Sequence, residues 1–154
     1  MRPDAENELR VFLSKYNPSV RSVAVASRET LRRLLPGAFE LVYDNYNALV
    51  IAFGATEKTS EVVLSIALYP RWVHLFFANG ATLLDPDGLL EGDGKQVRRI
   101  RLDTAAVLDR APVRALIAEA VAASKRPFDP GAANQLVIKS ISKKQRPRKP
   151  ASPA

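Results

Sequence analysis

Apolar residues in the first 35 positions recur every three or four residues, the spacing of one face of an α-helix. In residues 4–16 this face holds Ala5, Leu9, Phe12, Leu13 and Tyr16. A second helix is predicted from residue 17 to 35, because Asn17 suits the N-cap and proline is favoured at the first helical position, here Pro18. The sequence Leu-Pro-Gly at 35–37 ends it, since proline and glycine interrupt helices.

From residue 39 the apolar period changes to two, which is typical of β-strands. Residues 39–53 predict two strands around a turn at 44–47, and residues 62–70 and 72–78 predict two more, joined at Pro70–Arg71. A fifth strand is predicted at 96–103, with Ile100 and Leu102 inward and Arg99 and Arg101 outward. The short connections favour antiparallel pairing.

The last helix is expected to start near Arg110 and to end before Pro127, and residues 134–141 predict an edge strand or a docked extension. The order of elements predicts an α+β fold. Its antiparallel sheet has about five or six strands, with the N- and C-terminal helices packed on one face. We expect one domain over residues 1–141 and a basic, proline-rich, disordered tail over 142–154.

The excess positive charge of the sequence is concentrated at its C-terminus. The net charge is +7, but six bases and no acid follow residue 138, which leaves 17 bases against 16 acids in the rest of the chain. The domain itself is therefore nearly neutral. The sequence has no cysteine, no apolar run of the ~18 residues that a membrane helix needs, and no signal-peptide pattern at its start. We expect a cytoplasmic protein without a membrane partner.

No catalytic constellation, metal site or cofactor motif is identified. The single histidine, His74, fits a half-exposed sheet position better than a triad or a zinc site, which need further partners. The acids Asp85, Asp87, Glu91 and Asp93 do not have calcium-loop spacing, and Gly-Asp-Gly-Lys at 92–95 does not match a phosphate-binding loop. We therefore predict a protein that is not an enzyme.

Aromatic and basic side chains suggest where a binding domain would hold an unknown small ligand or protein. Aromatic residues on an uncovered sheet face can form a platform for a ligand, although they can equally be core and turn residues. The predicted binding residues on and around this face are Tyr46, Tyr69, Arg71, Trp72, His74, Lys95, Arg99 and Arg101.

The basic tail supports a second hypothesis, in which the protein associates non-specifically with nucleic acid. Its candidate contacts are Lys139, Lys143, Lys144, Arg146, Arg148 and Lys149. The alternative for this segment is a solubilising tail. The predicted second helix also carries Arg21, Arg28 and Arg32 on one stripe, as a phosphate contact or a solvated face.

Three stretches resemble the YdhG-like bacterial domain of unknown function, some members of which are described as frataxin-like. They are LPGAFELVYDNYNALVIAF, IALYPRWVHLFF and LLEGDGKQVRRIRL, and the resemblance covers roughly residues 34–123. It implies an antiparallel sheet with helices on one face. The frataxin-like label also implies iron handling through acidic side chains, so an iron-binding protein is a third hypothesis.

Overall fold

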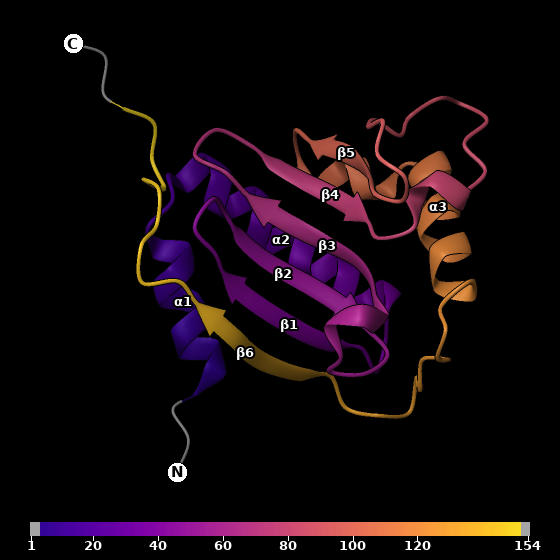
Figure 1. The fold of residues 1–154 in the computed structure, drawn as a ribbon, viewed down its shortest axis with the longest axis horizontal. Coiled ribbons are helices and arrows are strands. Elements are labelled where there is room, and N and C mark those ends of the chain that lie inside the picture. The colour runs from indigo at the N-terminus through magenta and orange to yellow at the C-terminus, as the bar shows by residue number, and fades with distance from the viewer. Residues whose placement is uncertain (1–3, 152–154) are drawn as a thin grey trace.

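The computed structural model describes residues 4–151 and contains three α-helices, three short 3₁₀ helices and one six-stranded sheet (Figure 1). The α-helices are α1 (Ala5–Ser14), α2 (Pro18–Leu34) and α3 (Ala111–Ala122). The 3₁₀ helices are η1 (Thr59–Glu61), η2 (Gly80–Thr82) and η3 (Ala105–Asp109). The strands are β1 (Phe39–Asp44), β2 (Leu49–Gly54), β3 (Val62–Leu68), β4 (Val73–Phe77), β5 (Arg98–Leu102) and β6 (Gln135–Ile141).

The N-terminal helices begin where the sequence predicts. The Asp4 side chain caps α1 by accepting a hydrogen bond from the Glu6 amide at 3.0 Å, which satisfies one of the free N–H groups of the first turn. Helix α2 starts at Pro18, with Asn17 at the N-cap position, although the Asn17 side chain makes no capping hydrogen bond. Both helices bury the apolar stripe that the 3.6-residue period identified.

The sheet has the order β5-β4-β3-β2-β1-β6. Strands β1 to β5 form an antiparallel meander, as predicted, but β6 pairs with β1 in parallel, so the sheet is mixed. The parallel direction arises because the segment after α3 returns to the end of the sheet where β1 begins. There, the Asn134 side chain accepts a hydrogen bond from the Gly37 amide at 2.9 Å. Gly37 has φ of 80°, and a Cβ at this position would lie 1.8 Å from the Asp129 carbonyl oxygen, so only glycine fits.

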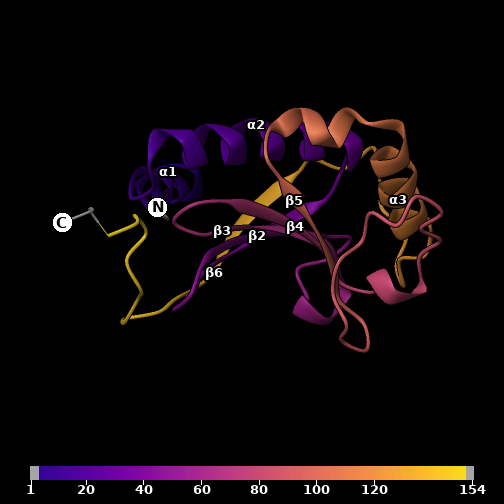
Figure 2. The same cartoon turned by 90° about the horizontal axis from the view of Figure 1, so that it is seen from above.

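The helices cover one face of the sheet and leave the other open. Figure 2 shows α1, α2 and η3 above the strands and α3 at one end. The helix-facing side of the strands forms one core with them, and its fully buried members include Tyr16, Leu31, Ile51, Leu64 and Phe77. The segments containing η1 and residues 83–97 project on the opposite side, where they border the open face. The predicted α+β class, with helices packed on one face, is confirmed.

A charged cluster joins the two N-terminal helices to the sheet. Glu40 on β1 is 1% exposed, and its carboxylate binds Arg28 Nε at 2.6 Å and Arg32 Nε at 3.0 Å. Arg28 also donates to both carboxylate oxygens of Glu6 on α1, at 2.8 and 3.1 Å. The hydrogen bonds from Arg28 lower the pKa of Glu6. Burial would lower the pKa of Arg28, but the hydrogen bonds that it donates to Glu6 and Glu40 outweigh burial and raise it. Arg28 and Arg32 are therefore occupied in holding the fold, and are not a free phosphate-binding stripe.

The tail is the main correction to the sequence-based picture. Residues 142–151 are not a disordered arm but continue past the end of β6 (Figure 1) and form hydrogen bonds with the β1–β2 hairpin. Arg148 is 6% exposed and binds Asp44 Oδ1 at 2.8 Å, through an ion pair that no local pattern of residues predicts. Residues 152–154 of the predicted tail lie outside the described residues. Within residues 4–151, none of the helices combines the length and the apolar character needed to cross a membrane.

Candidate functional site

Two cross-strand rows of side chains run over the open face from β1 to β5. Directly opposed residues in neighbouring strands point to the same face, so the strand register defines each row. The first row is Tyr43, Val50, Ala67, His74 and Arg101. The second row is Leu41, Ala52, Ser65, Phe76 and Arg99.

The middle of both rows is made of small residues, and this hollows the open face into a trough. Val50, Ala52 and Ser65 form part of its floor, whereas Tyr43 and Phe76 form walls on either side. Thr59 of η1 and Val97 before β5 close it further, and the hollow has a volume of about 350 Å³. The lining is largely apolar. We call this hollow the trough.

An aromatic stack stands beside the trough, on β4 and the turn before it. The rings of Trp72 and His74 are stacked, with centroids 6.1 Å apart and planes at 19°. His74 also meets Tyr69 at 5.5 Å and the edge of Phe76 at 5.8 Å. Trp72 is 37% exposed, so part of its side chain is open to solvent. We call these four residues the aromatic platform.

Two arginines of β5 give the platform a positive charge. Arg99 and Arg101 are the direct strand partners of Phe76 and His74. The guanidinium of Arg101 lies 5.2 Å from the centre of the Trp72 ring, within the range of a cation–π interaction. Its other contact is an exposed ion pair with Asp103 at 2.9 Å, which is a weak competitor for an incoming anion.

The platform lowers the pKa of His74. Burial disfavours its charged form, and the Arg99 and Arg101 cations lower the pKa further, against a smaller opposing effect of Glu91. The imidazole is therefore neutral at pH 7. Neutral imidazole extends the aromatic surface without adding charge, which suits a stacking role.

This pKa predicts a specific pH dependence of stability. Since the folded-state pKa lies below the unfolded value, the unfolded chain binds the proton more readily. The stabilisation is fully present above the unfolded pKa of about 6.5 and is lost as the pH falls through the folded pKa. The unfolding midpoints of the wild type and of His74→Gln, measured in urea from pH 7.5 to 5, should therefore converge or cross as the pH falls. Parallel profiles would contradict the shift.

The predicted binding residues separate into groups. Tyr69, Trp72, His74, Arg99 and Arg101 come together as the sequence suggested. Arg71 is exposed in the turn between β3 and β4, beside the platform. Tyr46 lies in the β1–β2 turn, where its carbonyl accepts a hydrogen bond from the Arg146 amide at 2.8 Å. Lys95 is exposed in the segment before β5 and takes no part in the contacts of the platform.

The basic residues predicted to contact nucleic acid also differ in their exposure. Lys139 lies on β6 and donates to the Glu57 carbonyl at 3.1 Å. Lys143, Lys144, Arg146 and Lys149 are exposed, whereas Arg148 is buried and unavailable to a partner.

The acids of the 83–95 segment differ in their surroundings, and Asp87 and Asp93 are exposed. The Asp85 carboxylate accepts hydrogen bonds from the Leu89 and Leu90 amides at 2.9 and 2.8 Å. Glu91 exchanges backbone hydrogen bonds with Arg99 at 2.9 Å. Within the described part of the chain, no group of three or more histidine and acidic side chains has an arrangement that could hold a metal ion.

Sequence reasoning missed the trough and the walls that enclose it. The signal was present, because Val50, Ala52, Ser65 and Ala67 occupy the outward positions of two strands and are all small. A run of small outward residues between Tyr43 and Phe76 indicates a hollow once the strands are placed in order. Comparison of the chain with models of known protein families, with curated proteins and with solved structures gave no match.

Proposed function

We propose that this chain is a cytoplasmic binding domain, not an enzyme, and that its open face takes an aromatic organic anion. The observation that carries the proposal is the trough of small residues between Tyr43 and Phe76, with Arg99 and Arg101 at the end of the same two rows. Membership of the YdhG-like family remains part of this proposal and rests on the sequence stretches alone.

The chemistry of the face selects the ligand class. A largely apolar floor favours flat, apolar groups, because it gains from their removal from water. The exposed outer surface of Trp72 offers a stacking partner, and the guanidinium groups favour a carboxylate or sulfonate. An aromatic anion combines the two properties. A ferrous iron site has no comparable support among residues 4–151.

Anilinonaphthalene sulfonate is a suitable probe, because it is both aromatic and anionic. Trp72 is the only tryptophan of the sequence, so energy transfer from it to the probe reports binding near the platform. Ser65→Phe fills the floor of the trough and should weaken probe binding about tenfold, the loss that about 1.4 kcal/mol of contact energy produces. Phenylalanine is well tolerated on a strand, so the fold is expected to survive.

Ser22→Phe is the matched control. Ser22 is exposed on α2, on the opposite side of the molecule from the trough, and the substitution has the same chemistry. Probe binding should be unchanged in this variant. Equal affinity in Ser65→Phe and the wild type, with both folded by circular dichroism, would show that the trough is not the binding site.

A further inference from the structure

We propose that the C-terminal segment and the β3–β4 turn together form a groove that binds single-stranded nucleic acid. The proposal goes beyond the open-face site and does not depend on the ligand of the trough. It also differs from binding by a flexible basic arm, because the cations concerned are held in place by the fold.

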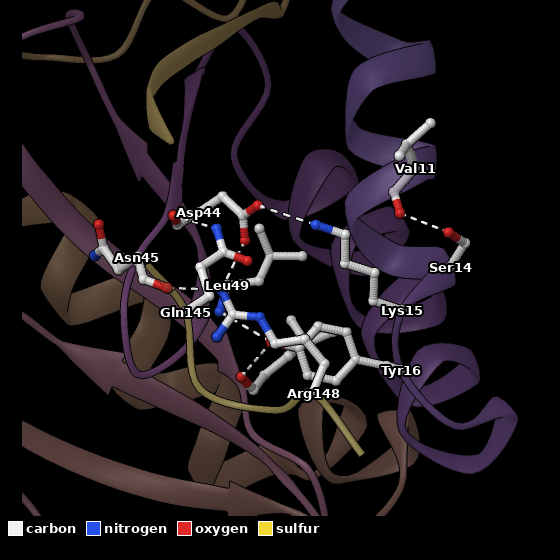
Figure 3. Close-up of polar contacts among 10 residues, drawn as sticks. Val11, Ser14, Lys15, Tyr16, Asp44, Asn45, Leu49, Gln145 and Arg148 are labelled. Carbon is white, nitrogen blue, oxygen red and sulfur yellow. Dashed lines mark hydrogen bonds and ion pairs between the residues drawn. The ribbon is translucent and has the colours of Figure 1, made fainter. Parts of the chain in front are cut away.

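The C-terminal segment is fixed to the β1–β2 hairpin by polar contacts at both of its ends. The Asp44 carbonyl accepts hydrogen bonds from the Ser142 amide at 2.9 Å and from the Gln145 side chain at 3.0 Å. Arg148 then inserts between the hairpin and α1, where it donates to the Asp44 carboxylate and to the Asn45 carbonyl (Figure 3). Its guanidinium also lies 5.8 Å from the centre of the Tyr16 ring.

The residues on either side of the buried Arg148 are exposed. Arg146 and Lys149 are exposed and line a groove of about 600 Å³, opposite Tyr69 and Arg71 of the β3–β4 turn. The lining holds three cations and, among the described residues, no acid. None of the three forms an ion pair within residues 4–151. The groove is therefore a concentrated, unneutralised positive site.

The position of Tyr69 favours a single strand over a duplex. Tyr69 lines the groove and also contacts His74 of the aromatic platform at 5.5 Å. A strand whose phosphates lie along Arg71, Arg146 and Lys149 would thus meet aromatic rings on which unpaired bases can stack. A duplex keeps its base faces inside the helix and gains only the phosphate contacts.

The test is fluorescence anisotropy of a labelled 15-residue oligothymidylate with the full chain. Arg146→Gln/Lys149→Gln should weaken binding about tenfold or more at low salt. It should also reduce the slope of log affinity against log salt by about 1.4, at about 0.7 for each lost phosphate contact. Lys143→Gln/Lys144→Gln removes the same charge from exposed positions outside the groove, and should have a much smaller effect.

Two further variants distinguish a groove formed by the fold from general attraction between charges. Tyr69→Leu should weaken oligothymidylate binding but leave duplex binding unchanged. Ser65→Phe should leave oligothymidylate binding intact, which separates this site from the trough. Equal losses in the two double variants, a duplex that binds as tightly as the single strand, or no binding by the wild type would each overturn the proposal.

Discussion

Replacing Arg148 with alanine is expected to lower the free energy of unfolding by roughly 3 to 5 kcal/mol, the cost of removing one partner from a buried ion pair. The Asp44 carboxylate is 1% exposed, and among residues 4–151 its only other cation is Lys15, whose Nζ lies 4.0 Å from Oδ2. Without Arg148 the buried carboxylate keeps only this longer contact with a half-exposed lysine. For a chain of this size the loss corresponds to a fall of roughly 10 °C in the unfolding midpoint.

Two controls isolate the ion pair from the charge change itself. Arg146→Ala removes the same charge from an exposed neighbour and should change stability by about 0.5 kcal/mol or less. Asp44→Asn in the Arg148→Ala background removes the uncompensated charge and should recover part of the loss. Urea unfolding of the four proteins measures both effects. Arg148→Ala with wild-type stability would mean that the C-terminal segment is not docked in solution.

Replacing Arg28 with alanine is expected to cost roughly 2 to 3 kcal/mol. Arg28 is the only residue that links Glu40 on β1 to Glu6 on α1 among the described ion pairs, through contacts of 2.6 and 2.8 Å. Its removal leaves the buried Glu40 with one partner, Arg32, whose side chain is 41% exposed. The substitution therefore removes the closest counter-charge of Glu40 and also the link that Arg28 makes between α1 and β1.

Arg33→Ala is the matched control for this prediction. Arg33 lies in the last turn of the same helix and is exposed. Within the part of the chain that the structure describes, its side chain donates only to the Thr30 hydroxyl, at 3.3 Å. We expect its loss to cost about 0.5 kcal/mol or less, as for most surface substitutions. Similar unfolding free energies for the two variants would show that the Glu6–Arg28–Glu40 cluster does not stabilise the fold.

The elements of this fold could be predicted from the sequence because each depends on a local pattern. The Asn17–Pro18 start of α2, the alternation of β1 and β2 and the turn at Pro70–Arg71 are all set by neighbouring residues. The parallel pairing of β6 could not be predicted in the same way. It depends on a contact between Gly37 and Asn134, which are far apart in the sequence.

The docked tail could not be predicted for a related reason. Residues 142–151 have the charge and proline content that is typical of disordered segments. Composition predicts how such segments behave on average, but it does not predict a single contact with a distant residue. The tail is held in place by contacts with the distant β1–β2 hairpin, among them the ion pair of Arg148 with Asp44, which lies 104 residues earlier. The two strand residues of the aromatic platform, His74 and Phe76, by contrast follow from alternation along β4 alone.

The open-face site is the central claim, and a titration of the ¹⁵N-labelled full chain with anilinonaphthalene sulfonate tests it most directly. We expect the amide signals of Val50, Ala52 and Ser65, together with the Trp72 indole signal, to shift first and by the largest amounts. The signals of α2 should stay in place. Shifts that concentrate on the helices, or that spread evenly over the molecule, would contradict the proposed site.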